Sequence, residues 1–410
     1  MSDTVPLRSN PRFTRLWSAR VVSRFGSALS YVVLIWLTYA ETGSSLAVAY
    51  VGLAEFIPTV AVGLFSGALV DRFDRRRVIV LSVLGRSAAM GGLVVALELF
   101  GFRLPLILLA SVVFSILATF FGPGSQALLP EIVPRDSLAD ANGLFESSEA
   151  IVGIVGSSLA GVFIVIVGAV PSLGIDAASY LVAALFIALI GGTSVSRAPP
   201  VDRPSLLGEV REGLAYLRRA LGLLEVTVAA LVLNFWFAFV LTFLVIYTTE
   251  LLHGSAVVFG ALETLIAGGW GIGGLLVGRL RLTRYTGRLW VYSAFVEGGA
   301  IVAMVLVPRL AVAVPLFLAV GILQGVLNVA GSSTVQAVVP ERLQGRYFAT
   351  ENMVSFAAIP AAQIVGGVLI LLHGISFTFL LAGVGSLATG GCLVWLKDLR
   401  RFGYDPRPSG

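Results

Sequence analysis

The stretch that decides the fold is Gly67-Ala-Leu-Val-Asp-Arg-Phe-Asp-Arg-Arg-Arg77, which carries two aspartates and four arginines. It joins two predominantly apolar runs, residues 46–70 and 78–99. A helix needs about 20 apolar residues to cross the hydrocarbon of a bilayer, where backbone polar groups can bond only to one another. The stretch is therefore predicted to be a polar loop between two membrane-spanning helices.

The same alternation extends over the whole chain. Of its 410 residues, 57% are hydrophobic and 12% are charged, whereas a soluble domain has about 25% charged residues. The pattern indicates a polytopic membrane protein with twelve spanning helices. The predicted spans are residues 19–41, 46–70, 78–99, 105–129, 142–168, 171–191, 223–250, 255–279, 288–307, 311–335, 347–372 and 375–396.

The basic residues predict how these helices are oriented. With twelve spans, 24 of the 28 lysine and arginine residues fall in the termini and in loops on one side. The loops on the other side hold only Arg103 and Arg309, while Arg24 and Arg86 lie within spans. Because cytoplasmic loops are rich in Lys and Arg, both termini are expected in the cytoplasm of a cell whose inner membrane holds the protein.

Two halves of the sequence resemble each other. Three ordered segments recur at offsets of 208, 207 and 210 residues, and they begin at Gly52, Gly67 and Gln126. This repetition predicts two pseudo-symmetric six-helix bundles, a fold that is entirely α-helical. We expect an N-terminal bundle over residues 1–192, a cytoplasmic linker with an amphipathic helix over 193–221 and a C-terminal bundle over 222–410.

The loop and three other stretches carry a family resemblance. Segment 67–77 resembles the cytoplasmic signature of the major facilitator superfamily, and segments 133–144, 176–181 and 212–218 are similar to its twelve-helix drug and macrolide exporter branch. The resemblance implies that the first, fourth, seventh and tenth helices line a cavity open alternately to either side. The predicted fifth span departs from the antiporter pattern of the superfamily, because Gly156 is followed by Ser157 and not by proline.

The resemblance also implies a cytoplasmic gate in the loop. An aspartate at this position braces the two halves in the superfamily, and the start of the eleventh helix offers the positive end of a helix dipole. The alternative is that these charges only set topology or meet lipid headgroups. The candidate gate residues are Gly67, Asp71, Arg72, Arg75 and Arg76.

Carboxylates inside a membrane cost free energy when ionised and mark functional sites. Those at the ends and middles of spans here are Glu55, Glu146, Glu149, Glu263 and Glu297. Arg86, in the third span, is a candidate partner for Glu55, so a structural ion pair and proton coupling remain alternatives for that residue. Glu263 has no arginine near it in its own span and is the better candidate proton carrier.

Polar stripes and aromatic residues occur on the predicted cavity helices. Aromatic faces attract cations and accept varied shapes, which suits bulky amphipathic substrates. For the aromatic column of the seventh span, helix packing or lipid contact is the alternative. The candidate cavity residues are Arg24, Ser27, Tyr31, Ser115, Thr119, Asn234, Trp236, Phe239, Phe243, Gln324 and Asn328.

These features predict a secondary transporter rather than an enzyme. Cys392 is the only cysteine, the only lysine follows Leu396 and so forms no phosphate-binding loop, and two histidines form no metal-ligand pattern. We expect no cofactor, no metal and no nucleic acid partner. The expected function is proton-coupled export of hydrophobic or amphipathic drugs such as macrolides by a monomer in the bilayer. Alternatives are a siderophore exporter, a lysophospholipid flippase, or a membrane scaffold or sensor that transports nothing.

Overall fold

The computed structural model describes residues 7–70, 72–191, 214–217 and 221–403. These residues form helices and connecting turns, and they cluster into two compact units. Unit 1 comprises Met1–Pro199 and Gly254–Thr264, and unit 2 comprises Pro200–His253 and Leu265–Gly410. The predicted amphipathic linker helix lies largely outside the described residues, since only 214–217 of it are helical within them.

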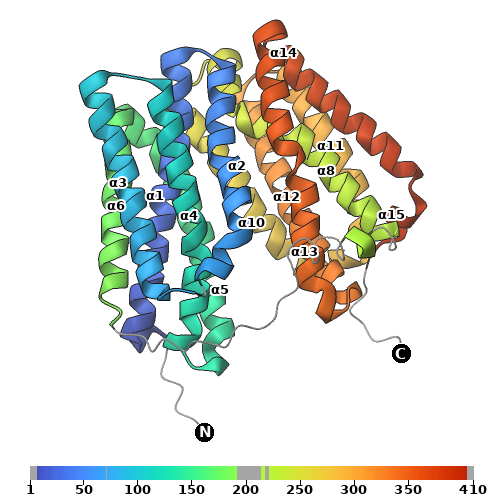
Figure 1. Cartoon of the computed structure of the whole chain (residues 1–410). Helices are drawn as coiled ribbons and strands as arrows, with labels where there is room; N and C mark the ends of the chain where they lie inside the picture. Colours follow the sequence, from blue (N-terminus) through green and yellow to red (C-terminus); the bar gives the residue numbers. More distant parts are fainter. Residues whose placement is uncertain (1–6, 71, 192–213, 218–220, 404–410) are drawn as a thin grey trace. The chain divides into compact units, whose positions relative to one another are not determined.

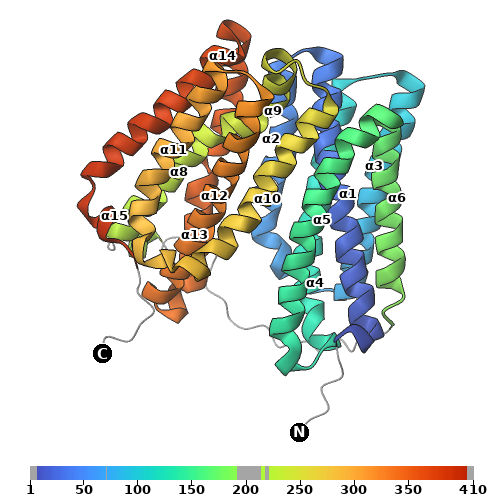
Figure 2. The ribbon, with the colours of Figure 1, turned by 180° about the vertical axis from the view of Figure 1, so that it is seen from behind.

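Unit 1 is built on six long helices that run side by side (Figure 1). In Figure 2, α1 lies between α5 and α6, and α1 packs closely on both. Further contacts join α3 to α4 and α6, and α2 to α4. The six helices are α1 (Pro11–Thr42), α2 (Ser45–Val70), α3 (Arg75–Phe100), α4 (Leu104–Ile132), α5 (Leu138–Ile166) and α6 (Ala169–Ala188).

Unit 2 has the same kind of helical architecture with more interruptions. Its tightest pairs are α11 with α14 and α8 with α14. A π-helical turn over Tyr247–Leu251 ends the α8 region. The helices are α8 (Leu221–Thr242), α9 (Leu244–Ile246), α10 (Ala256–Leu280, whose first residues belong to unit 1), α11 (Thr286–Leu306), α12 (Leu310–Val338), α13 (Glu341–Phe356), α14 (Ala358–Trp395) and α15 (Lys397–Arg401).

Local sequence signals explain several helix ends. Asn10 caps α1, because its side-chain oxygen accepts from the backbone N–H groups of Arg12 and Phe13. Gly43 ends α1 in a left-handed conformation, with φ of 58°, which glycine adopts without a Cβ clash. Asp74 caps α3 in the same way as Asn10, accepting from the N–H of Arg77 at 2.8 Å. The polar loop between α2 and α3 therefore also starts the third helix.

Among the described residues, eleven helical segments are long and apolar enough to cross a membrane. The sequence predicts twelve spans, and the difference lies at the C-terminal end. The predicted spans 347–372 and 375–396 fall within one segment, Arg346–Trp395. Gly374 interrupts that segment with φ of 81° and ψ of 170°, which is not helical geometry. The two predicted spans are thus joined through a kink and not through a loop.

Candidate functional site

A buried polar cluster of unit 1 surrounds Arg86 on α3, a residue that is 3% exposed. Its guanidinium donates to the hydroxyls of Ser23 at 3.1 Å, Ser27 at 2.6 Å and Tyr180 at 2.7 Å. The same group lies over the rings of Phe114 and Tyr180, with 4.4 and 4.1 Å between the guanidinium carbon and the ring centroids. Four helices therefore enclose one charge.

Asp176 is the acidic residue beside this cluster, although no hydrogen bond or ion pair joins its carboxylate to Arg86 among the described residues. It is fully buried on α6, one turn before Tyr180, and lies within electrostatic reach of Arg86. Its carboxylate packs against Gly26 of α1, where a Cβ atom would collide with it. Among the described residues no ion pair joins Arg86 to Glu55. The candidate ion pair between these two residues is therefore not present in the structure.

Arg20, near the start of α1, is a second buried arginine of unit 1. Its Nε is 2.5 Å from Oε1 of Glu149 on α5, and its Nη1 donates to Ser125 on α4 at 2.8 Å. The guanidinium also covers the ring of Phe145 at 4.4 Å. Glu149 is thus held in a structural ion pair, whereas Glu146, the other candidate on the first turns of α5, is exposed.

Tyr31 on α1 is within electrostatic range of two carboxyl groups of unit 1. Both Glu55 on α2 and Glu263 on α10 lie close enough to act electrostatically on the Tyr31 hydroxyl. Oε1 of Glu263 is buried and has no hydrogen-bond partner among the described residues. This pair brings together two residues from corresponding positions of the sequence repeat, Gly52–Glu55 and Gly260–Glu263.

Glu297 is the buried carboxylate of unit 2, with 1% of the residue exposed. Gln324 of α12 donates to its Oε2 at 3.1 Å, and Ser386 of α14 donates to its Oε1 at 3.3 Å. Gln324, predicted to line the substrate cavity, is therefore engaged by a carboxylate inside the unit. Asn328, one turn further along α12, is exposed.

The predicted gate residues occupy different settings. Asp71 lies outside the described residues, Gly67 lies near the end of α2 and Arg72 is exposed in the following turn. Arg75 donates to Glu131 at 2.5 Å and to the Ala127 carbonyl at 3.0 Å, which ties α3 to the end of α4. Arg76 donates to carbonyls at the end of α6, among them that of Gly191 at 3.3 Å.

Most of the predicted cavity residues of unit 1 bond within the bundle. Ser27 belongs to the Arg86 cluster, and Ser115 donates to the Ala54 carbonyl of α2 at 3.1 Å. Thr119 donates to a carbonyl of its own helix, Ile116, at 2.7 Å. Arg24 is exposed, with its guanidinium beside Gly153 of α5.

The aromatic column of α8 packs inside unit 2. Phe239 and Phe243 are fully buried against Gly366 of α14. These two residues therefore pack between helices, which was the alternative to a place in the substrate cavity. Trp236 donates from its indole nitrogen to Thr389 at 3.2 Å, and Asn234 donates to the Ser355 carbonyl at 3.0 Å. These polar groups bind α8 to α14 and α13.

The sequence did not single out Asp176, Tyr180 or Ser125 as site residues. Asp176 and Tyr180 are four residues apart, a spacing that places both on one face of a helix, and this face was the available signal. Within the described ranges, no group of three or more His, Cys, Asp and Glu side chains could hold a metal ion.

The fold and these buried charges define a membrane transporter of the major facilitator type. Two solved structures share the fold: a bacterial homologue of the human lysosomal transporter Spinster, with TM-score 0.71 at 15% identity over 97% of this chain and 100% of that one, and the nucleoside transporter NupG, with TM-score 0.73 at 13% identity over 93% and 99%. Likeness at this level of identity concerns the fold alone.

Sequence comparison identifies a family within this class of transporters. The family described as "Transmembrane secretion effector" matches residues 1–409, and the chain belongs to this family. The multidrug efflux pump Tap of Mycobacterium tuberculosis is 28% identical over 411 residues, covering 97% of this chain and 96% of the pump. Macrolide efflux protein A of Streptococcus pyogenes is 26% identical over 400 residues, covering 95% and 97%. The expected superfamily and exporter branch are thus confirmed.

Proposed function

We propose that this protein is a secondary active exporter that carries amphipathic small molecules, macrolides among them, out of the cell by alternating access. The observation that carries the proposal is its similarity to a multidrug and a macrolide efflux protein over nearly the full length of each chain. The protein acts as a monomer in the inner membrane, with both termini in the cytoplasm, as the arginine distribution predicts.

Inward proton flow drives the export in this proposal. Moving one charge down the membrane potential supplies about 2.3 kcal/mol per 100 mV, which supports useful accumulation without ATP. Glu263 and Glu55 are the proposed proton carriers of unit 1, because Tyr31 brings them into one electrostatic neighbourhood and neither is in an ion pair among the described residues. Glu149 is excluded from this role by its bond to Arg20.

The remaining candidates take supporting roles. Arg86 and Asp176 hold α1, α3 and α6 together as a rigid body, and a rocking mechanism needs such rigid bundles. Arg75 and Arg76 fix the start of α3 to α4 and α6. Asp71 and Arg72 are proposed to form the breakable contacts of the cytoplasmic gate.

Efflux from intact bacteria tests this function. Cells lacking their own major exporters, with and without this protein, are loaded with a fluorescent cationic dye, and loss of the dye is followed over time. The protein should lower dye retention, macrolides should compete for export, and a protonophore should abolish the difference. Export that survives the protonophore would refute proton coupling. Absence of both dye and macrolide export would refute the substrate class and favour the siderophore or lysophospholipid alternative.

A further inference from the structure

A basic pocket of about 570 Å³ opens at one end of unit 2. It lies where the start of α11 meets the end of α14 and the short helix α15. All the charged residues that line it are cationic: Arg288, Lys397, Arg400 and Arg401. None of the four forms an ion pair with a residue in the described part of the chain, so their combined charge is available to a ligand.

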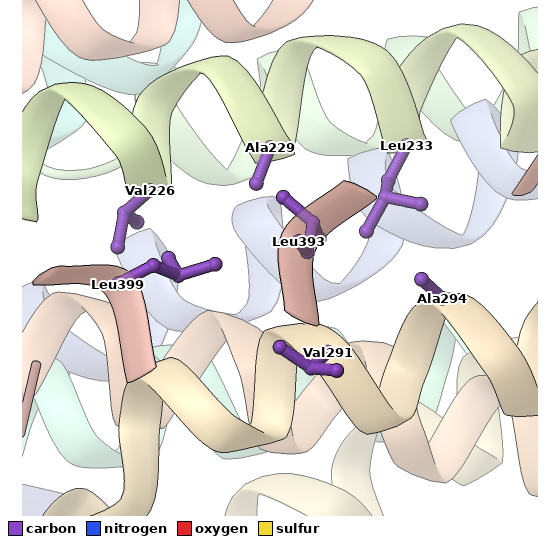
Figure 3. Close-up of a cluster of buried hydrophobic side chains, with 7 residues drawn as sticks. All are labelled: Val226, Ala229, Leu233, Val291, Ala294, Leu393 and Leu399. Carbon is purple, nitrogen blue, oxygen red and sulfur yellow. The ribbon is translucent and has the colours of Figure 1, made fainter. Parts of the chain in front are cut away.

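The backbone that presents these cations is held firmly in place. Leu399 of α15 is fully buried and belongs to the hydrophobic cluster drawn in Figure 3, in which it lies near Val226 of α8. The backbone N–H of Leu399 donates to the Glu225 carboxylate, and the N–H of Gly287 donates to the Phe402 carbonyl at 2.7 Å. The pocket is therefore preorganised, which reduces the entropy cost of binding.

The apolar part of the lining distinguishes this pocket from a simple anion site. Val291, Tyr292 and Val394 complete its wall, and Tyr292 and Val394 are 61% and 38% exposed. Trp395, directly after Val394 at the end of the spanning segment, is 83% exposed. Tyrosine and tryptophan favour the membrane interface, where an apolar ring and a polar edge are both accommodated.

We propose that this pocket binds the phosphate headgroup of an anionic phospholipid from the adjoining leaflet, with the acyl chains lying along Tyr292, Val394 and Trp395. The arginines supply planar donors that match phosphate oxygens, and basic pockets between spanning helices suit such headgroups. The arginine distribution predicts that this leaflet is the cytoplasmic one. None of the residues that line this pocket is among the proposed cavity residues or proton carriers.

Native mass spectrometry of the purified full-length protein tests the proposal. The protein is incubated with phosphatidylglycerol, with phosphatidylcholine, or with inorganic phosphate, and retained ligand is counted. Wild type should retain one phosphatidylglycerol in preference to phosphatidylcholine. The double variant Arg400→Gln, Arg401→Gln should bind it about 25-fold more weakly, since each basic residue contributes on the order of a fivefold gain near a lipid surface.

A second variant and a matched control complete the design. Arg288→Gln with Lys397→Gln should weaken phosphatidylglycerol retention similarly, whereas Arg279→Gln with Arg281→Gln, exposed on the same unit outside the pocket, should leave it unchanged. Equal retention of both lipids, or equal losses in the pocket and control variants, would overturn the site. Competition by millimolar inorganic phosphate that displaces the lipid would assign the pocket to a soluble anion instead.

Discussion

Arg86 shows what a charge within a membrane bundle requires of its neighbours. Its three hydrogen bonds and two aromatic contacts use residues from α1, α4 and α6, and the carboxyl group of Asp176 lies within electrostatic reach. Removing one member of a buried charged pair leaves the other uncompensated, which is more costly than removing both. The stability of unit 1 should therefore depend on this pair as a unit.

Replacing Arg86 by methionine tests that dependence. Arg86→Met should lower the free energy of unfolding by about 3–5 kcal/mol, because Asp176 is left buried without its cation. The double variant Arg86→Met, Asp176→Asn should lose less than the sum of the two single variants. Chemical denaturation of the purified protein in detergent measures all three, with Arg24→Met, an exposed arginine of α1, as the control. Strictly additive losses would show that the two residues do not interact.

Glu263 is the residue that the proposed proton coupling requires most directly. Glu263→Gln keeps the size of the side chain but cannot bind and release a proton, so export should lose its dependence on the pH gradient. Initial rates of dye efflux at several imposed gradients measure this dependence. Glu98→Gln, at the exposed end of α3, should behave as wild type. A Glu263→Gln variant with an unaltered response would place the proton elsewhere.

At the scale of helices, glycine governs how closely α10 and α12 approach. A Cβ on Gly321 or Gly325 of α12 would clash with the backbone of Ile266 or Trp270 on α10, and Gly269 and Gly273 of α10 face α12 in the same way. The sequence shows these glycines in pairs four residues apart, the spacing of closely packed membrane helices. Gly63, in a similar sequence pair, has open space where its Cβ would lie.

Alanine substitution separates the two kinds of glycine. Gly325→Ala should destabilise unit 2 by about 1–3 kcal/mol, since backbone atoms of α10 must move to admit the methyl group. Gly331→Ala, on the same helix with nothing near its Cβ position, should be neutral or slightly stabilising, because alanine is the better helix former. Thermal unfolding in detergent compares them. Similar melting temperatures for the two variants would mean that the helices do not pack this tightly.

For the whole molecule, apolar runs predict which residues are helical but not which helices are neighbours. The lengths of the apolar runs predict the spans well. The exception is the last pair of predicted spans, which follow one another across a kink at Gly374, because a glycine can redirect the chain without a loop. Arg20 bonds to Glu149, which is 129 residues away along the chain, and Arg86 bonds to Tyr180, which is 94 residues away. No local pattern encodes such pairings, so the contact of Arg86 with Tyr180 could be found only in the folded bundle.

Orientation is a further whole-molecule prediction. In a Cys392→Ser background, which removes the only cysteine, a membrane-impermeant thiol reagent applied to intact cells should label Arg103→Cys and Arg309→Cys. It should not label Arg281→Cys until the membrane is permeabilised, because the arginine distribution predicts that the basic loops are cytoplasmic. Labelling of the 281 variant in intact cells would invert the topology.

The central claim is that this one chain couples proton movement to substrate movement. Purified protein reconstituted into liposomes, with a pH-sensitive dye inside and a substrate added outside, tests it most directly. With a gradient imposed across the bilayer, substrate accumulation and dissipation of the gradient should rise together, and both should vanish in Glu263→Gln. Substrate accumulation with no accompanying proton movement would contradict the account.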